Sequence, residues 1–217
     1  MKIRIFAFDG AGEMDFLAPW EVFRSAAEMH PGTDVALVTT EPVEAIVAQH
    51  GLRVRPDGVF DGSADLVLVP GGGYVANKPA GIRREIARGV LGPAVRSVHR
   101  KGAVVAAVCT GTMLLAAEGM LDGRPATTHH SAIEDLRRTR ALVRTNRVVD
   151  DGDIVTAGGV ASGLDLAFWI VERVFGAESA SMIARFMEYT PSRDIYRAAQ
   201  EICGGAPAGI LAWGVKA

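Results

Sequence analysis

The chain has 217 residues, of which 49% are hydrophobic and 22% are charged, and its net charge is -2. This composition suits one domain with a full hydrophobic core, and the charge balance argues against a large basic face for nucleic acid. No run of about 18 apolar residues occurs, so the sequence predicts no membrane span. The two cysteines, Cys109 and Cys203, form neither a disulfide framework nor a zinc motif, and we expect a reducing, cytoplasmic location.

Strand-like and helix-like segments alternate in the N-terminal half. A first strand is expected at residues 3–8, and a helix at residues 18–29 with Pro19 in its first turn. The further elements expected in this half are a strand at 34–39, two short strands within 43–55 around His50-Gly51, a strand at 65–69 ending at Pro70-Gly71-Gly72-Gly73, and a helix over 81–101 broken near Gly92-Pro93.

The alternation continues in the C-terminal half and sets the fold class. Continuous apolar strands between helices predict one α/β domain over residues 1–217, with a mostly parallel, flavodoxin-like sheet covered by helices on both faces. The elements expected here are strands at 103–108 and 126–128, helices at 111–118 and 131–140, a hairpin of 148–150 with 154–157, helices at 161–175 and 178–188, and a less regular tail at 192–217.

Cys109 is the leading candidate for a nucleophile. It follows the apolar strand at 103–108 and precedes a helix, which places its thiol on a tight strand-to-helix turn. Free N–H groups and partial positive charge at a helix start favour thiolate over thiol, so the cysteine is set up for nucleophilic attack. The alternative interpretation is a buried, inert cysteine.

Three residues on neighbouring turns could assist such a nucleophile. The N–H groups of Thr110 and Gly72 would stabilise negative charge that develops on a substrate. Asp15 would reach the same edge of the sheet from a loop before the first helix. The alternatives are a plain turn or a phosphate loop around Gly72, and a helix cap for Asp15. No glycine-rich nucleotide motif follows the first strand.

Six segments carry a resemblance to a known family, over about residues 3–191. The segments are Met14-Asp15-Phe16-Leu17-Ala18-Pro19, Pro70-Gly71-Gly72, Val108-Cys109-Thr110-Gly111, Ala126-Thr127-Thr128-His129-His130, and residues 146–152 and 156–165. Together, in this order, they resemble the ThiJ/PfpI superfamily of cysteine-dependent α/β proteins. The resemblance implies that Cys109 and Asp15 are catalytic.

Within that superfamily the chain most resembles the isocyanide (isonitrile) hydratases. Asp15 stands where the deglycase and chaperone branches carry Glu, and Thr110 stands where other branches often have Ala or His. The stretch Glu188-Tyr189-Thr190-Pro191 is similar to Glu-Tyr-Ala-Pro near the hydratase C-terminus. One departure is His130, where hydratases carry Trp, and it puts the shape of the pocket in question.

The resemblance implies hydration of an isocyanide to an N-substituted formamide, without a metal or organic cofactor. Cys109 would form a covalent thioimidate, Asp15 would donate or relay the proton, and Thr110 would orient water or the carboxyl group. His129 has either a direct role or a structural or dimer-contact role. The implied partners are a small-molecule isocyanide and a second copy of the chain in a homodimer, with no nucleic acid and no membrane. Candidates for an apolar pocket are Phe16, Trp20, Tyr74 and Trp169.

Three rival functions use the same cysteine. A glyoxalase or deglycase acting on reactive carbonyls would usually pair it with Glu, which Asp15 disfavours. A ligand-binding domain of an AraC-type regulator is disfavoured because no basic recognition helix follows. A redox sensor would oxidise Cys109 to a sulfinic acid, and this chemistry is compatible with catalysis. We assign no chemistry to Cys203 in the tail.

Overall fold

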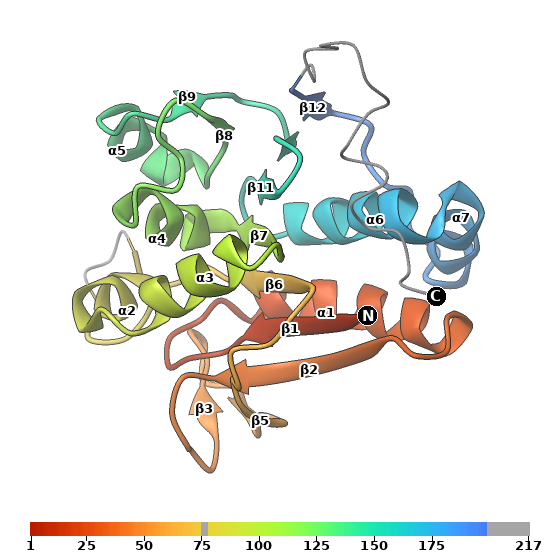
Figure 1. Ribbon diagram of the computed structural model, residues 1–217, viewed down its shortest axis with the longest axis horizontal. Coiled ribbons are helices and arrows are strands. Elements are labelled where there is room, and N and C mark those ends of the chain that lie inside the picture. Colours follow the sequence, from red (N-terminus) through yellow and green to blue (C-terminus); the bar gives the residue numbers. More distant parts are fainter. Residues whose placement is uncertain (75–77, 199–217) are drawn as a thin grey trace.

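The computed structural model describes residues 1–74 and 78–198, whose centre is an eight-stranded sheet (Figure 1). Its strands are β1 (Lys2–Phe6), β2 (Asp34–Thr39), β5 (Gly58–Val59), β6 (Leu66–Val69), β7 (Val104–Val108), β10 (Val148–Asp150), β11 (Ile154–Ala157) and β12 (Ile195–Arg197). Their order across the sheet is β12-β10-β11-β7-β6-β1-β2-β5. All neighbours are parallel except β10 and β11, which form the expected antiparallel hairpin.

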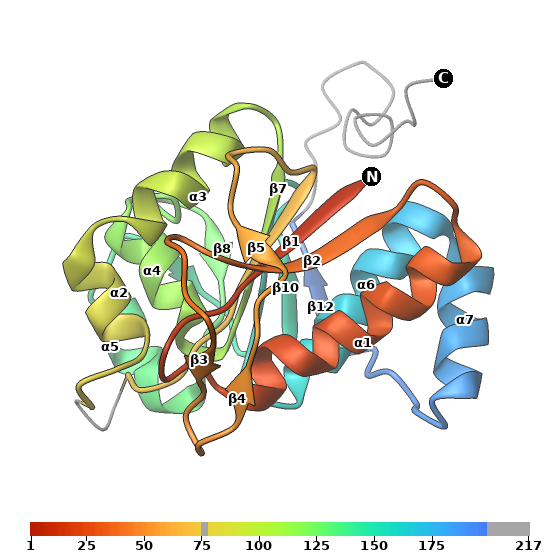
Figure 2. The same cartoon turned by 90° about the horizontal axis from the view of Figure 1, so that it is seen from below.

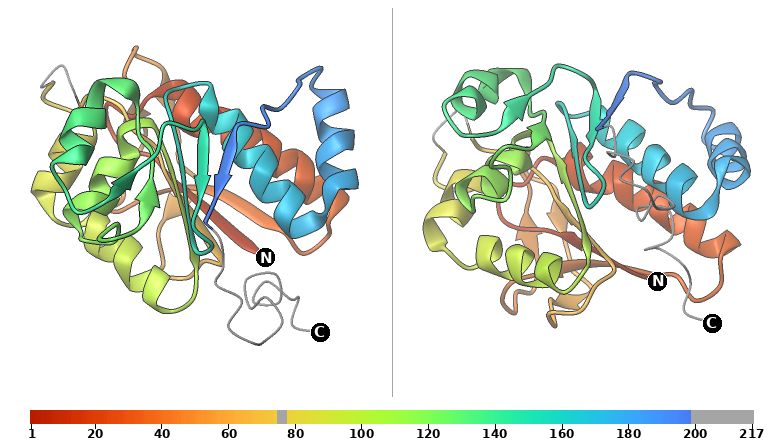
Figure 3. Two further views of the ribbon diagram at one scale, coloured as in Figure 1. Left: turned by 90° about the horizontal axis from the view of Figure 1, so that it is seen from above. Right: turned by 45° about the horizontal axis from the view of Figure 1, so that its top comes forward.

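Helices cover both faces of this sheet, as expected for a flavodoxin-like α/β fold. They are α1 (Glu13–Met29), α2 (Ile82–Arg88), α3 (Leu91–Arg100), α4 (Thr112–Ala117), α5 (Ile133–Arg137), α6 (Ser162–Phe175) and α7 (Ala177–Phe186). Helices α1, α6 and α7 pack together on one face, and α2, α3 and α4 lie on the other (Figures 2 and 3). Gly163 lets α6 approach closely, since a Cβ there would meet the Pro19 ring of α1 at 3.3 Å.

Two small sheets flank the main one. β3 (Ile46–Val47) pairs antiparallel with β4 (Arg53–Val54), as expected around His50-Gly51. β8 (Pro125–Ala126) pairs in parallel with β9 (Leu142–Val143). The first of these sheets is tied to the loop after β1, because Gln49 N–H donates to the Ala11 carbonyl at 2.9 Å and Gly10 N–H to the Val47 carbonyl at 2.8 Å.

The central strands explain where the site forms. Every residue of β6 and β7 is buried, because parallel strands covered by helices on both faces exclude water completely. These strands run parallel to β1, so the segments that follow all three emerge at one edge of the sheet. That edge carries the loop before α1, the glycine turn after β6 and the Cys109 turn after β7, and open α/β folds bind ligands there.

Helix α1 begins at Glu13 rather than at residue 18, so the expected loop position of Asp15 is wrong. Pro19 suggested a helix start, but it lies in the interior of α1. The helix starts earlier because the Asp15 N–H already donates to the Gly12 carbonyl at 3.0 Å. Asp15 therefore lies in the first turn of α1 on its buried side.

The helix expected over residues 81–101 breaks earlier than expected. α2 ends at Arg88 and is followed by Gly89, whose φ of 65° is in the left-handed region that favours glycine. Pro93 lies in the first turn of α3, where a missing N–H breaks no helical hydrogen bond.

Among the described residues, three strands were not expected. They are β5, at one edge of the main sheet, β9, which pairs with β8, and β12, which lies inside the segment expected to be a less regular tail. Cys203 and the apolar residues 210–213 lie outside the described residues. Among the described helices, none has the length and apolar character needed to cross a membrane.

Candidate active site

Cys109 occupies a strand-to-helix elbow between β7 and α4. Its backbone φ is 58°, a conformation that few residues other than glycine adopt, and its side chain is 7% exposed. Two hydrogen bonds hold this turn: Cys109 N–H donates to the Gly158 carbonyl at 2.9 Å, and the Thr128 hydroxyl donates to the Cys109 carbonyl at 2.9 Å. The elbow expected from the sequence is confirmed.

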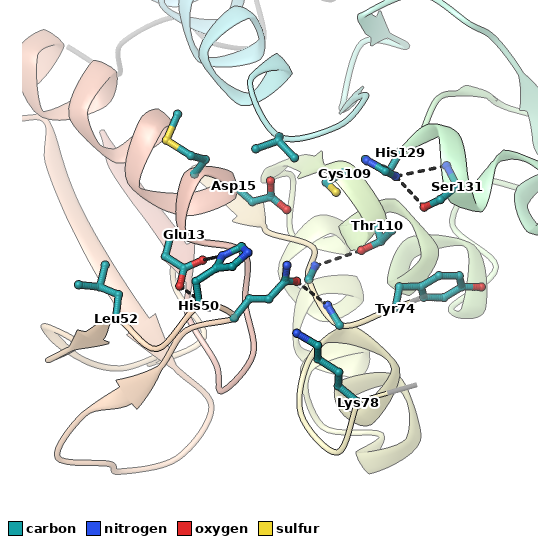
Figure 4. Close-up of a pocket in the computed structure, with 16 residues that line it drawn as sticks. Glu13, Asp15, His50, Leu52, Tyr74, Lys78, Cys109, Thr110, His129 and Ser131 are labelled. Carbon is teal, nitrogen blue, oxygen red and sulfur yellow. Dashed lines mark hydrogen bonds and ion pairs between the residues drawn. The ribbon is translucent and has the colours of Figure 1, made fainter. Parts of the chain in front are cut away.

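Asp15 lies beside this cysteine, and both line the same pocket (Figure 4). Its residue is 2% exposed, and its Oδ2 accepts a hydrogen bond from Gly71 N–H at 3.1 Å. Burial raises the pKa of Asp15 to about 6, although the hydrogen bonds from the Cys109 thiol and the Gly71 N–H act in the opposite direction. With this pKa the Asp15 carboxyl group can both accept and release a proton near neutral pH.

The thiol of Cys109 responds to the same surroundings. Burial, and after it the charge of Asp15, raise the pKa of Cys109 to about 12, while the N–H groups of Val160 and Thr110 lower it. The sequence predicted a thiolate at this helix start, whereas the raised pKa keeps the thiol protonated. The cause is that burial raises the pKa more than the two N–H groups lower it. Between the two pKa values the pair holds one proton, and its resting form is a thiol beside a carboxylate.

The glycine turn after β6 is built around Thr110. The Thr110 hydroxyl oxygen accepts the Gly72 N–H at 3.1 Å, so this N–H already has a partner, whereas the sequence suggested that it faces a substrate. Val160 supplies the second N–H near the sulfur instead, from a backbone with φ of 43°. Gly71 has no room for a side chain: a Cβ there would lie 2.5 Å from Thr110 Oγ1 and 3.0 Å from Asp15 Oδ2.

His129 lies on the cavity wall across from Asp15 (Figure 4), and its hydrogen bonds define which ring nitrogen carries the proton. Its Nδ1 lies 2.6 Å from the Ser131 hydroxyl oxygen and accepts the Ser131 N–H at 3.2 Å. Burial, and then the charge of His130, lower the pKa of His129. Because Nδ1 is an acceptor, the neutral ring carries its proton on Nε2. The ring packs on Gly159, where any Cβ would clash with it.

These groups open into one cavity of about 480 Å³ (Figure 4). Of the four aromatic residues expected to form an apolar pocket, only Tyr74 lines it. Phe16 is in the core, and Trp169 donates its indole N–H to Asp150 at 2.8 Å on another side of the fold. The lining residues are Gly12, Glu13, Met14, Asp15, Gln49, His50, Leu52, Gly72, Gly73, Tyr74, Lys78, Cys109, Thr110, His129, Ser131 and Val160.

Sequence reasoning missed three of these residues. Val160 contributes only its backbone N–H, which no side-chain pattern signals. No motif in the sequence indicated a functional role for His50 or for Glu13. Their contact depends on the hairpin of β3 and β4 folding back onto the start of α1. In residues 1–74 and 78–198, no three His, Cys, Asp or Glu side chains gather in a way that could hold a metal ion.

A profile of the DJ-1/PfpI family matches residues 1–173, and the chain belongs to this family. Isonitrile hydratase of Pseudomonas putida is 29% identical over 194 residues, which cover 88% of this chain and 80% of that protein. Protein DJ-1alpha of Drosophila melanogaster is 28% identical and covers 83% of this chain and 81% of its own length.

Solved structures agree with the fold. A ThiJ/PfpI family protein from Pseudomonas syringae superimposes with a TM-score of 0.78 at 23% sequence identity, over 95% of this chain and 81% of that one. Oxidized DJ-1 of Toxoplasma gondii gives a TM-score of 0.74 at 22% identity, over 87% of this chain and 98% of that one. At these identities the likeness establishes the fold alone.

Proposed function

We propose that this protein hydrates organic isocyanides to N-substituted formamides. The observation that carries the proposal is the buried pair of Asp15 and Cys109, which holds one proton between pKa values of about 6 and about 12. Isocyanide hydration needs a nucleophile for the terminal carbon and a proton for the same carbon, and this pair offers both. The similarity to the isonitrile hydratase of Pseudomonas putida supports the same reaction.

In the first half-reaction the thiol sulfur of Cys109 forms a bond to the terminal isocyanide carbon. Asp15 accepts the thiol proton and delivers it to that carbon, which gives a thioimidate and leaves Asp15 ionised again. The N–H groups of Thr110 and Val160 stabilise the sulfur as its negative charge develops. The one proton that leaves the sulfur is the one that reaches the carbon, and the charge on Asp15 is restored. The step as proposed therefore needs no cofactor.

In the second half-reaction water adds to the thioimidate carbon. Asp15 takes one proton from this water and passes it to the nitrogen, and the remaining hydroxyl stays on the carbon. The carbon–sulfur bond then breaks as the hydroxyl proton moves through Asp15 to the sulfur. These steps release the formamide and restore the thiol and the carboxylate. Thr110 lines the same cavity, and its hydroxyl, which accepts the Gly72 N–H, would orient this water.

A glyoxalase-type reaction is the second candidate, because His129 also lines the cavity with Nε2 as its protonated nitrogen. An imidazole near a cysteine can act as the general acid and base that moves protons between the atoms of a dicarbonyl substrate. The smaller Asp15 in place of Glu favours the isocyanide reaction. Both candidates require Cys109, so loss of activity in a Cys109 variant does not separate them.

The test is formamide production from a simple aryl isocyanide, with methylglyoxal consumption measured in parallel. We expect formamide from the wild type, none from Cys109→Ala, and a fall of about a hundredfold or more in kcat for Asp15→Asn. Methylglyoxal turnover without formamide would replace the hydratase by the glyoxalase. His129→Gln separates them further, since we expect it to impair only a dicarbonyl reaction.

We also propose a cytoplasmic homodimer, as the resemblance implied. Three apolar side chains at the cavity are well exposed in the single chain: Met14 and Leu52 are each 44% exposed, and Val160 is 47% exposed. A second copy seated at this edge would cover them. Light scattering on purified protein tests the dimer, and a monomeric mass would contradict it.

A further inference from the structure

Besides the pair of Asp15 and Cys109, a histidine–carboxylate pair lines the cavity, and it has no part in the proposed steps. Glu13 binds His50 twice: Oε1 accepts the His50 backbone N–H at 2.6 Å, and Oε2 lies 2.7 Å from His50 Nδ1. Burial raises the pKa of Glu13, but the hydrogen bonds from His50 outweigh it and the pKa lies below its ordinary value. An ionised Glu13 only accepts hydrogen bonds, so Nδ1 carries a proton.

This contact fixes what His50 offers to a ligand. With the proton on Nδ1, the Nε2 atom of the neutral imidazole is a hydrogen-bond acceptor. The hydrogen bond from Nδ1 to the carboxylate polarises the ring and makes Nε2 a stronger acceptor. Figure 4 shows the ring lying between Glu13 and the interior of the pocket. The cavity therefore has an acceptor nitrogen on the wall formed by the hairpin of β3 and β4.

The position of the pair separates it from the reacting atoms. Cys109 is 7% exposed at the floor of the cavity, whereas the His50 side chain is 76% exposed at its mouth. A substrate that places its terminal carbon on the sulfur directs its substituent outward. The hairpin that carries His50 is pinned by Asp9, whose Oδ1 accepts Val47 N–H at 2.8 Å, so the acceptor has a defined place.

We propose that Glu13 and His50 select isocyanides whose substituent carries a hydrogen-bond donor, above all a hydroxyl group. The inference rests on the proposed function for the identity of the reacting group, but the acceptor site at His50 Nε2 does not depend on that function. His50 accepts the hydroxyl proton at Nε2, and Glu13 is the positioning residue that fixes the tautomer. A substituent without a donor makes no hydrogen bond with Nε2, so its binding gains nothing from this contact.

The first experiment compares 4-(hydroxymethyl)phenyl isocyanide with its methyl ether, 4-(methoxymethyl)phenyl isocyanide. The two differ only in the donor, and they are assayed at a mildly alkaline pH that favours neutral imidazoles. We expect the wild type to prefer the alcohol by about tenfold in kcat/KM, mainly through KM. His50→Phe should bring that ratio to about one, and Glu13→Gln should lower it to an intermediate value.

A matched control is available on another face of the protein. His99 Nε2 lies 2.9 Å from Asp153 Oδ2, a histidine–carboxylate pair that does not line the cavity. We expect His99→Gln to retain the preference for the alcohol. A loss of preference in this control would mean that the effect of His50→Phe is not local, and it would overturn the assignment.

A binding experiment keeps the inference separate from the proposed function. Cys109→Ala protein is titrated by calorimetry with the two corresponding formanilides, which are the hydration products. If the alcohol binds more tightly and the double variant Cys109→Ala, His50→Phe loses this difference, the result supports the acceptor site at His50. It does so even if the wild type hydrates neither isocyanide. Equal turnover of both isocyanides with unaltered ratios in His50→Phe overturns the inference and leaves the hydratase standing. Failure of both formanilides to bind also overturns it.

Discussion

The Asp15 carboxyl group and the Cys109 thiol lie together at the floor of the cavity, and each changes the pKa of the other. After burial, the Asp15 charge is the largest factor that raises the pKa of Cys109, and the thiol in turn donates a hydrogen bond that opposes the raised pKa of Asp15. The proton stays on sulfur at rest, and the carboxylate is poised to move it. This relationship supports most of the following predictions.

Asp15→Asn should lower the pKa of the Cys109 thiol, because it removes the neighbouring negative charge. We expect the midpoint of thiolate formation, followed by ultraviolet absorbance, to fall by about one pH unit or more. Subtracting the titration of Cys109→Ala isolates this thiol. An unchanged midpoint would mean that Asp15 has no electrostatic contact with the sulfur. The same variant should lose hydration despite its more acidic thiol.

Hydration should fall as the pH decreases through about 6. Below that value Asp15 is protonated in the resting enzyme, so it has no free position for the thiol proton. The expected profile of kcat/KM is a plateau at neutral pH with a tenfold loss per pH unit on the acid side. A profile that stays flat to pH 4 would contradict the role of Asp15 as proton carrier.

Asp15→Asn should stabilise the folded protein at neutral pH. Burial raises the carboxyl pKa from 3.8 to about 6, so folding disfavours the ionised form and stability is lost as the pH rises through this interval. Above pH 6 the wild type carries the full penalty, on the order of 3 kcal/mol. Thermal unfolding should show a higher Tm for the variant at pH 8 and nearly equal values at pH 3.5. A lower Tm at pH 8 would contradict this sign.

Gly71→Ala should abolish activity. Its Cβ would approach Thr110 Oγ1 at 2.5 Å and Asp15 Oδ2 at 3.0 Å, so both groups would have to move. We expect a loss of about a hundredfold or more in kcat/KM, since small displacements of a reacting pair are costly. Gly58→Ala is the control, because nothing lies within 4 Å of its added carbon. Equal activity in the two variants would refute the tight packing at Gly71.

The positions of Cys109 and the glycine turn could be predicted from the sequence, because they follow from the order of strands and helices along the chain. An apolar strand followed at once by a helix fixes Cys109 at a sheet edge, and the glycine turn after β6 meets it there because parallel strands end together. The start of α1 was misjudged because Pro19 is typical of a first helical turn, whereas tertiary packing lets it lie further in. The unexpected strands β5, β9 and β12 have two or three residues each, too few for a periodic signal.

The missed parts of the site depend on contacts between distant segments. The N–H of Val160 reaches the sulfur only because the loop after β11 adopts a positive φ there. His50 reaches the cavity only because Glu13 holds both its backbone and its ring. The use of Gly72 N–H by Thr110 likewise depends on the distance between two turns, 38 residues apart in the chain.

The most direct test of the account is intact-mass spectrometry of the protein mixed rapidly with an aryl isocyanide. We predict a transient increase equal to the full mass of the isocyanide, located on Cys109, absent in Cys109→Ala, and decaying as fast as formamide appears. Formamide formation by wild-type protein with no such adduct, even when the reaction is quenched within the first turnover, would contradict covalent catalysis by Cys109.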